Sequence, residues 1–265
     1  MASWKKVTLL VLSSISTSAF AQDFPVMDWG PMIQTEAMNS VTEDIGRSEA
    51  KRAGIPYPRD RKVNRRPRAV RDTLSQSLAT QLTGSSAATA AIDASYKPSA
   101  IVREKLAGIL SDAVARQDAA KREEMRQLVL SARALQEYER IGPSLGLRAN
   151  DAIDAYAFYL LAQWGVANDH RADVTRAQAV GVRRQAAGAY ATIKDQLGTD
   201  ALRQEFAEAL VIQGTILAGV HETAVRSGDE AALARYAALA RRGGTTIFSM
   251  DPSRIALTDA GFRTK

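Results

Sequence analysis

Four acidic residues form two pairs whose spacing could support acid–base chemistry. Glu205 and Glu208 stand three residues apart, and Asp151 and Asp154 repeat that spacing. Hydrolysis of a glycosidic bond needs two carboxyl groups several ångströms apart across a cleft, normally supplied by different elements. A Glu-x-x-Glu pair within a helix is more typical of a solvated face, and aspartate in a first helical turn more typically complements the helix dipole. The pairs favour a structural role and leave a cell-envelope hydrolase using a Glu/Asp pair as the alternative.

The chain offers little for nucleophilic, metal or phosphate chemistry. It has no cysteine, no Gly-x-Ser-x-Gly turn and two histidines, His170 and His221. The position of His221 near the end of a long helical pattern indicates a partly buried ring with a backbone or carboxylate partner, with a binding role as the alternative. His170 lies in the polar stretch ANDHRAD, which lacks an established metal-ligand spacing. We therefore predict no catalytic residue, no metal and no cofactor.

Two further features could bind a ligand or a partner. Gln213 falls on the apolar stripe of a predicted helix, so its amide must find a partner inside the protein or line a cavity. A hydrogen bond to another helix is the simpler interpretation, and a small apolar ligand between helices near Gln213 and Gly214 is the alternative. Aromatic residues also gather in one predicted helix; they are Tyr156, Phe158, Tyr159 and Trp164. Their spacing predicts core packing, with a partner groove that includes Tyr156 and Trp164 as the alternative.

The longest helical pattern runs from Thr199 to Ser227 and must position several of these residues. Thr199 is a suitable N-cap, and Gly228 is a suitable end. One face of this helix is formed by Leu202, Phe206, Leu210, Gln213, Leu217, Val220 and Ala224. We expect the helix to lie at the centre of a bundle, with Glu208 on the opposite, solvent-facing side. Gly214 lowers helix propensity by about 1 kcal/mol relative to alanine, and close approach of a neighbouring helix would compensate.

Residues 98–265 predict an all-α domain, a compact bundle of about six helices. The other expected helices lie at about 99–113, 118–129, 132–141, 150–165, 175–197 and 229–242. Asn150 is the expected N-cap of the aromatic-rich helix, and Thr175 with Gln178 matches a capping box. Gly142-Pro143 and Gly243-Gly244 are expected to end two of the helices. The remaining C-terminal tail should wrap over the bundle.

The first 21 residues predict a secretory signal peptide. Lys5 and Lys6 precede an apolar stretch, Val7 to Ile15, and the sequence Ala19-Phe20-Ala21 resembles a cleavage site. The apolar stretch is shorter than the roughly 20 residues that a membrane-spanning helix needs. We therefore expect an exported protein, periplasmic or secreted, that has no transmembrane segment once the signal is removed.

Residues 22–97 predict an irregular, basic arm and linker rich in proline, serine and alanine. Arg47 to Asp72 carries ten basic and three acidic residues, a net charge of +7, and prolines such as Pro67 are expected to prevent a regular helix. The densest basic positions are the candidate binding residues Arg61, Lys62, Arg65, Arg66 and Arg68. Clustered guanidinium groups favour an anionic envelope component, either lipid headgroups or a polyanionic glycan. The predicted export argues against nucleic acid as a partner.

Several segments from Tyr96 onward resemble a known family. They are YKPSAIVREKL, GLRANDAIDAYAFYLLAQW, RAQAVGVRRQ, EFAEALVIQGTIL and the closing LTDAGF. In this order they resemble the bacterial exported domain-of-unknown-function 6683 family over the C-terminal two thirds of the chain. The resemblance implies a helical domain behind a signal peptide, and it brings no activity, cofactor or catalytic residue.

These observations favour an exported helical protein that binds a protein or an anionic envelope component without catalysis. Convergent carboxylates from different helices in a deep cleft would favour the hydrolase instead. A large apolar cavity near Gln213 and Gly214 would favour a carrier of a small apolar ligand.

Overall fold

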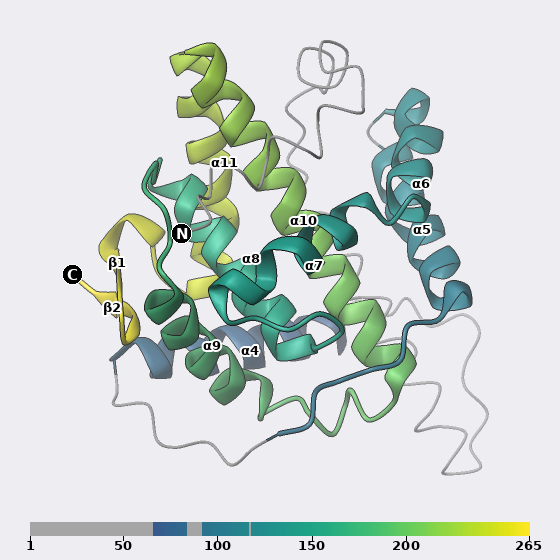
Figure 1. Cartoon of the computed structure of the whole chain (residues 1–265), viewed down its shortest axis with the longest axis horizontal. Coiled ribbons are helices and arrows are strands. Elements are labelled where there is room, and N and C mark those ends of the chain that lie inside the picture. The colour runs from purple at the N-terminus through teal and green to yellow at the C-terminus, as the bar shows by residue number, and fades with distance from the viewer. Residues whose placement is uncertain (1–65, 84–91, 117) are drawn as a thin grey trace.

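Helix α8 (Ala152–Ala167) lies in the middle of the fold, with other helices arranged around it (Figure 1). The computed structural model describes residues 66–83, 92–116 and 118–265, and within these ranges it contains eight α-helices and one two-stranded sheet. Every residue of α8 except Gly165 is buried, and Asp154 is its only charged residue. A helix that is apolar on all sides belongs in a core. The predicted all-α class is therefore confirmed. No helix of the described residues is long and apolar enough to cross a membrane.

Helix α10 (Asp200–Ser227) crosses α8 and has the predicted ends. The Thr199 hydroxyl accepts a hydrogen bond from the Leu202 amide at 3.3 Å, and Gly228 ends the helix with a positive φ of 69°. A Cβ atom at Gly214 would lie 3.0 Å from the Phe158 ring, so the close helix approach expected at this glycine is confirmed. Beyond Gly214 the helix becomes partly exposed, because it runs past the end of the core. In this structure α8, and not α10, is the most deeply buried helix.

Helix α11 (Glu230–Phe248) pairs with the second half of α10, and it continues through the glycines that were expected to end it. Gly243 and Gly244 are buried, and a Cβ at Gly244 would lie 2.3 Å from Cγ of Pro252. The glycine therefore allows close packing inside the helix. In the same way, α7 (Arg133–Leu145) includes Pro143 in its last turn and ends at Gly146, where φ is 76°. Both predicted helix ends were wrong.

The other helices flank this centre. Helix α5 (Ala100–Ala115) and α6 (Arg122–Leu130) lie side by side at one edge, joined by the short 3-10 helix η1 (Ala119–Lys121) (Figure 1). Helix α9 (Arg176–Tyr190) begins with the predicted capping box and ends before residue 197, because residues 191–197 form turns.

A short hairpin closes the C-terminus, where the sequence predicts only a wrapping tail. After the 3-10 helix η2 (Pro252–Arg254), strands β1 (Ile255–Thr258) and β2 (Gly261–Thr264) pair antiparallel. The hairpin rests on α9, where a Cβ at Gly181 would lie 2.3 Å from the Gly261 amide nitrogen. The Gln185 side chain accepts from the Phe262 amide at 2.7 Å and donates to the Phe262 carbonyl at 2.8 Å.

Helix α4 (Arg66–Thr83) corrects the expectation of an irregular arm through residue 97. Its leucines Leu74, Leu78 and Leu82 are buried in the main core, and the Ser77 hydroxyl contacts the Gly188 carbonyl at 3.5 Å. Pro67 stands in the first turn, where the missing N–H has no helical acceptor and costs nothing. The packed body therefore includes a helix that lies before residue 98.

Candidate functional site

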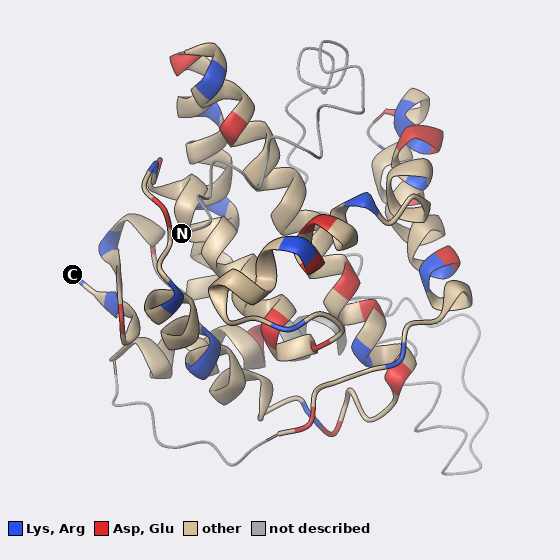
Figure 2. Ribbon diagram, in the orientation of Figure 1, with Lys and Arg blue, Asp and Glu red and all other residues tan. Residues whose placement is uncertain are grey.

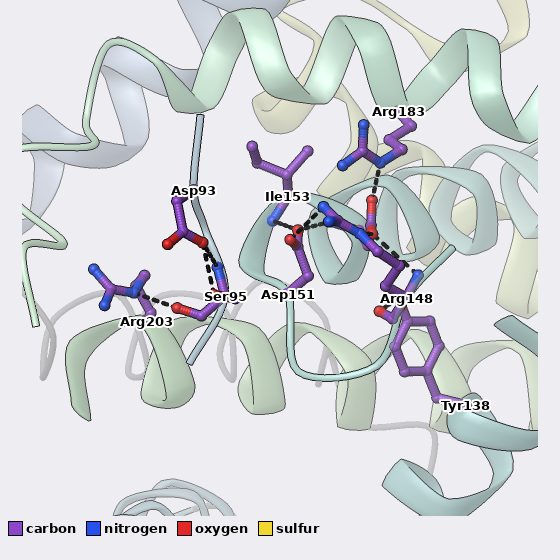
Figure 3. Close-up of polar contacts among 9 residues, drawn as sticks. Asp93, Ser95, Tyr138, Arg148, Asp151, Ile153, Arg183 and Arg203 are labelled. Carbon is purple, nitrogen blue, oxygen red and sulfur yellow. Dashed lines mark hydrogen bonds and ion pairs between the residues drawn. The ribbon is translucent and has the colours of Figure 1, made fainter. Parts of the chain in front are cut away.

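The two aspartates of the first candidate pair meet two arginines at the start of α8, where Figure 3 labels Asp151, Arg148 and Arg183. Asp154 is fully buried and accepts hydrogen bonds from the Arg148 backbone amide at 3.0 Å and from its Nε at 2.9 Å. Its other oxygen pairs with Nε of Arg183, which comes from α9. Asp151 pairs with Nη2 of Arg148 at 2.6 Å. The cluster therefore links α8, α9 and the loop that joins α7 to α8.

The backbone of that loop explains how the charges are placed. Asp151, and not Asn150, is the N-cap of α8, because its Oδ1 accepts the amides of Ile153 and Asp154 at 3.0 and 3.1 Å. Asn150 instead has a positive φ of 53°, which turns the chain into the helix. The Tyr138 hydroxyl donates to the Arg148 carbonyl at 3.1 Å, so α7 holds the loop from its other side. The expectation that the aspartates serve the helix start is correct, with Asn150 wrongly chosen as the cap.

The electrostatics of this cluster are those of a closed ion-pair network. Burial raises the pKa of the Asp151 carboxyl and the neighbouring Asp154 raises it further, while Arg148 and Arg183 act in the opposite direction. All four carboxyl oxygens of the two aspartates accept hydrogen bonds from protein groups. Because every oxygen of the pair already accepts from a protein donor, a substrate or an attacking water would have to compete with these donors. The arrangement fastens three segments together.

The extended segment around Ser95 and Tyr96 connects the cluster of aspartates and arginines to α10. The Tyr96 amide donates to the Asn150 carbonyl at 3.0 Å, and Ser95 and Asp151 form an isolated β-bridge. On its other side, Nε of Arg203 donates to the Ser95 carbonyl at 2.7 Å (Figure 3). The segment therefore lies between the beginnings of α8 and α10 and holds both.

The second candidate pair corrects the expectation of a solvated face. Glu205 and Glu208 are buried, with 2 % and 1 % of their surface exposed, because α5 covers this side of α10. Arg103 donates to Glu208 through Nε at 3.0 Å and Nη2 at 2.7 Å. Lys105 donates to Glu205 at 2.9 Å. In Figure 2, acidic residues mark the first half of α10 and basic residues mark the start of α5. Each carboxylate is thus neutralised by a cation from the neighbouring helix.

Both histidines have structural partners. His221 is 7 % exposed, and its Nε2 lies 2.8 Å from Oδ1 of Asp169, which confirms the predicted carboxylate partner. Arg171 also binds Asp169 at 2.7 Å and lowers the pKa of that carboxyl. The His170 ring lies 4.9 Å from the Trp164 ring, and burial lowers its pKa. In the described parts of the chain, no group of three or more His, Cys, Asp and Glu side chains could hold a metal ion.

The aromatic residues and Gln213 lie inside the protein. Tyr156 and Trp164 are buried, and the Trp164 indole donates to the Ile255 carbonyl at 3.0 Å, so neither residue forms a surface groove. Gln213 is 4 % exposed, yet neither its amide nitrogen nor its amide oxygen has a hydrogen-bond partner among the described residues. The simpler interpretation, a hydrogen bond to another helix, is therefore not found in this part of the chain.

The candidate binding residues come from different parts of the chain. Arg61, Lys62 and Arg65 lie outside the described residues, whereas Arg66 and Arg68 belong to the first turns of α4. Tyr156 and Trp164 are buried on α8, and Gln213 and His221 are buried on α10.

Sequence reasoning missed four basic residues that bind the carboxylate pairs; they are Arg103, Lys105, Arg148 and Arg183. Only Arg148 gave a local signal, since it stands three residues before Asp151. Partners such as Arg103 and Glu208, which are 105 residues apart, can be paired only once the fold is known.

Comparison with known proteins agrees with the resemblance seen in the sequence. A family model described as a family of unknown function, DUF6683, matches residues 58–265, so the chain belongs to this family. The match begins well before Tyr96 and includes all of α4. No curated protein and no solved structure matches the chain.

Proposed function

We propose that this chain is an exported, non-enzymatic binding protein of the bacterial cell envelope, whose helical domain presents a basic segment to an anionic partner. The observation that carries the proposal is the distribution of unbalanced charge. Within the helical domain, each carboxylate of the two candidate catalytic pairs is engaged by an arginine or lysine. The stretch from Arg47 to Asp72, in contrast, carries a net charge of +7.

The hydrolase alternative has less support from the geometry. Inverting and retaining glycosidases place two carboxyl groups on opposite sides of the scissile bond. Here the members of each pair are three residues apart on one element, the aspartates at the N-cap and first turn of α8 and the glutamates within α10.

The alternative of a carrier for a small apolar ligand also has less support, because it requires a large apolar cavity near Gln213 and Gly214. The side of α10 at Gly214 faces the Phe158 ring and the Tyr159 backbone at contact distance, and the unpartnered amide of the neighbouring Gln213 is unsuited to an apolar ligand.

The partner chemistry follows from the basic segment. Guanidinium groups pair bidentately with phosphate and carboxylate, which in the envelope belong to lipid headgroups and to acidic glycans. Each Lys or Arg near an anionic membrane surface contributes about 1 kcal/mol of binding free energy. Such binding weakens with salt, because the Debye length falls from about 10 Å at 0.1 M to about 3 Å at 1 M.

The test is co-sedimentation of the mature chain with phosphatidylglycerol vesicles, with phosphatidylcholine vesicles as the neutral reference. The arm variant carries Arg61→Gln, Lys62→Gln and Arg65→Gln. The matched control variant removes three exposed arginines of the helical domain, by Arg176→Gln, Arg184→Gln and Arg226→Gln. Both variants lose three positive charges, so only their location differs.

Wild type and the control variant should bind the anionic vesicles at about 0.1 M salt and release them near about 0.5 M salt. The arm variant should bind about 100-fold more weakly, as three lost charges at about 1 kcal/mol each imply. A soluble polyanion, dextran sulfate, should displace wild type from the vesicles if glycan and lipid share the site. Equal binding by both variants would refute the proposed role of the arm.

A further inference from the structure

Five side chains of the described residues bury polar atoms that have no hydrogen-bond partner there. Two of them are Glu205, through Oε1, and Thr215, through its hydroxyl. The other three polar groups are the Tyr159 hydroxyl, Oε1 of Gln163, and both amide atoms of Gln213. Tyr159 and Gln163 are each 1 % exposed. The great majority of buried polar atoms in proteins are hydrogen-bonded to protein groups or to ordered water, so three such side chains together require an explanation.

Helix geometry brings these side chains to one region. Tyr159 and Gln163 are four residues apart and lie on one face of α8, on which Tyr156 precedes Tyr159 by almost a turn. The Tyr156 ring stands 6.1 Å from the Phe206 ring of α10. Gln213 follows Phe206 by seven residues, about two helical turns, and so lies on the same face of α10.

A second contact places Gln213 beside Tyr159 independently of the aromatic pair. Its neighbour Gly214 is the point of closest approach between α10 and α8, since a Cβ there would lie 3.5 Å from Cα of Tyr159. Gln163 extends the region toward α11, because its Nε2 donates to the Ala240 carbonyl at 2.8 Å. That bond fixes the amide and leaves Oε1 as an acceptor.

The chemistry of the region is neutral. Burial raises the pKa of the Tyr159 hydroxyl, so the hydroxyl remains protonated and acts as a donor or acceptor without charge. The amides of Gln163 and Gln213 add both donors and acceptors, and neither carries a charge. Both oxygens of Glu208 are engaged by Arg103 from α5, whereas Glu205 binds Lys105 through Oε2 and its Oε1 has no partner among the described residues.

We infer that the crossing of α8, α10 and α11 binds a small neutral molecule that both donates and accepts hydrogen bonds, held by Tyr159, Gln163 and Gln213. Water is the smallest molecule of this chemistry, and a small alcohol or amide from the cell is the other source. Buried waters typically make about three hydrogen bonds to polar groups that would otherwise be unsatisfied. The three side chains supply that number.

The experiment uses the purified mature chain, and the wild type is measured before any variant. Native mass spectrometry detects a retained organic molecule as mass above that of the chain. Nuclear Overhauser effects from the Gln213 side-chain amide protons detect long-lived water or a bound molecule. The Gln185 side-chain amide is the internal control in the same spectrum, because it is buried and already bonded to the Phe262 carbonyl at 2.8 Å.

Extra mass with matching contacts at Gln213 would establish the organic molecule, and water contacts at Gln213 without extra mass would establish water. In either case Tyr159→Phe should weaken these contacts and lower the melting temperature, because a bound group loses a partner. The inference is overturned if Gln213 shows neither kind of contact and no extra mass is found. In that case Tyr159→Phe or Gln213→Leu should raise the melting temperature. That last result would show unsatisfied polar groups whose removal stabilises the core.

Discussion

Replacing Glu208 by alanine removes a carboxylate that is 1 % exposed beneath α5. The carboxylate accepts two hydrogen bonds from Arg103, at 3.0 and 2.7 Å, and one from Gln204 at 3.0 Å. Charge-assisted hydrogen bonds contribute about 1.5–3 kcal/mol each, and breaking a fully buried ion pair costs about 3–5 kcal/mol. Because 24 % of the Arg103 side chain is exposed, water recovers part of its hydration. We therefore expect the free energy of unfolding to fall by about 3 kcal/mol.

Urea denaturation followed by far-ultraviolet circular dichroism at pH 7 measures this loss. Glu104→Ala is the matched control, since Glu104 is an exposed glutamate on α5 and its loss should change stability by no more than about 0.5 kcal/mol. The double variant Arg103→Met with Glu208→Met should recover much of the loss, because a buried pair replaced by apolar groups leaves no unpaired charge. Equal midpoints for Glu208→Ala and Glu104→Ala would refute the buried ion pair between α5 and α10.

Three further predictions concern packing, pH and export. Gly181→Ala should lower the free energy of unfolding by about 1–3 kcal/mol, because its Cβ would overlap the Gly261 backbone. The control Gly108→Ala, with open space around it, should raise it by up to about 1 kcal/mol, and denaturation midpoints in the reverse order would contradict the hairpin contact. Burial lowers the pKa of His170 below 6.5, so protonation of the ring at acidic pH should destabilise the fold. Stability should therefore be complete above pH 6.5 and fall as pH drops through the lowered pKa, and an NMR titration that places the pKa at or above 6.5 would contradict this prediction. N-terminal sequencing of the exported protein should begin at Gln22, and a mature chain that retains residues 7–15 would exclude a cleaved signal.

Helix ends could be predicted from the sequence where a side chain supplies the cap. Thr175 with Gln178, and Thr199 with Gly228, are local arrangements whose partners lie within a few residues or in the same helix. Gly244 was misread because glycine serves both turns and close packing, and the atom that decides between them belongs to Pro252, in the next element. Local chemistry therefore predicts caps well and predicts tertiary packing poorly.

The burial of charge was the main feature that the sequence could not reveal. A helical stripe of apolar residues identifies one buried face of α10, but the opposite face is also buried, by α5. Whether Glu208 faces water depends on Arg103, a residue 105 positions away in the chain. The same limit applies to α4, whose buried leucines follow a proline-containing basic stretch and pack on residues distant in the sequence, such as those of α9.

The salt dependence of binding to dextran sulfate tests the proposed basic arm most directly. Each cation that pairs with the polymer releases a condensed counterion, so the logarithm of the binding constant falls with the logarithm of salt in proportion to the number of cations bound. The arm variant, with Arg61, Lys62 and Arg65 replaced by glutamine, should show a slope reduced by about one for each cation that no longer pairs with the polymer. The control variant, with Arg176, Arg184 and Arg226 replaced, should keep the wild-type slope. A slope that falls in the control variant and stays unchanged in the arm variant would place the binding surface on the helical domain and contradict the account.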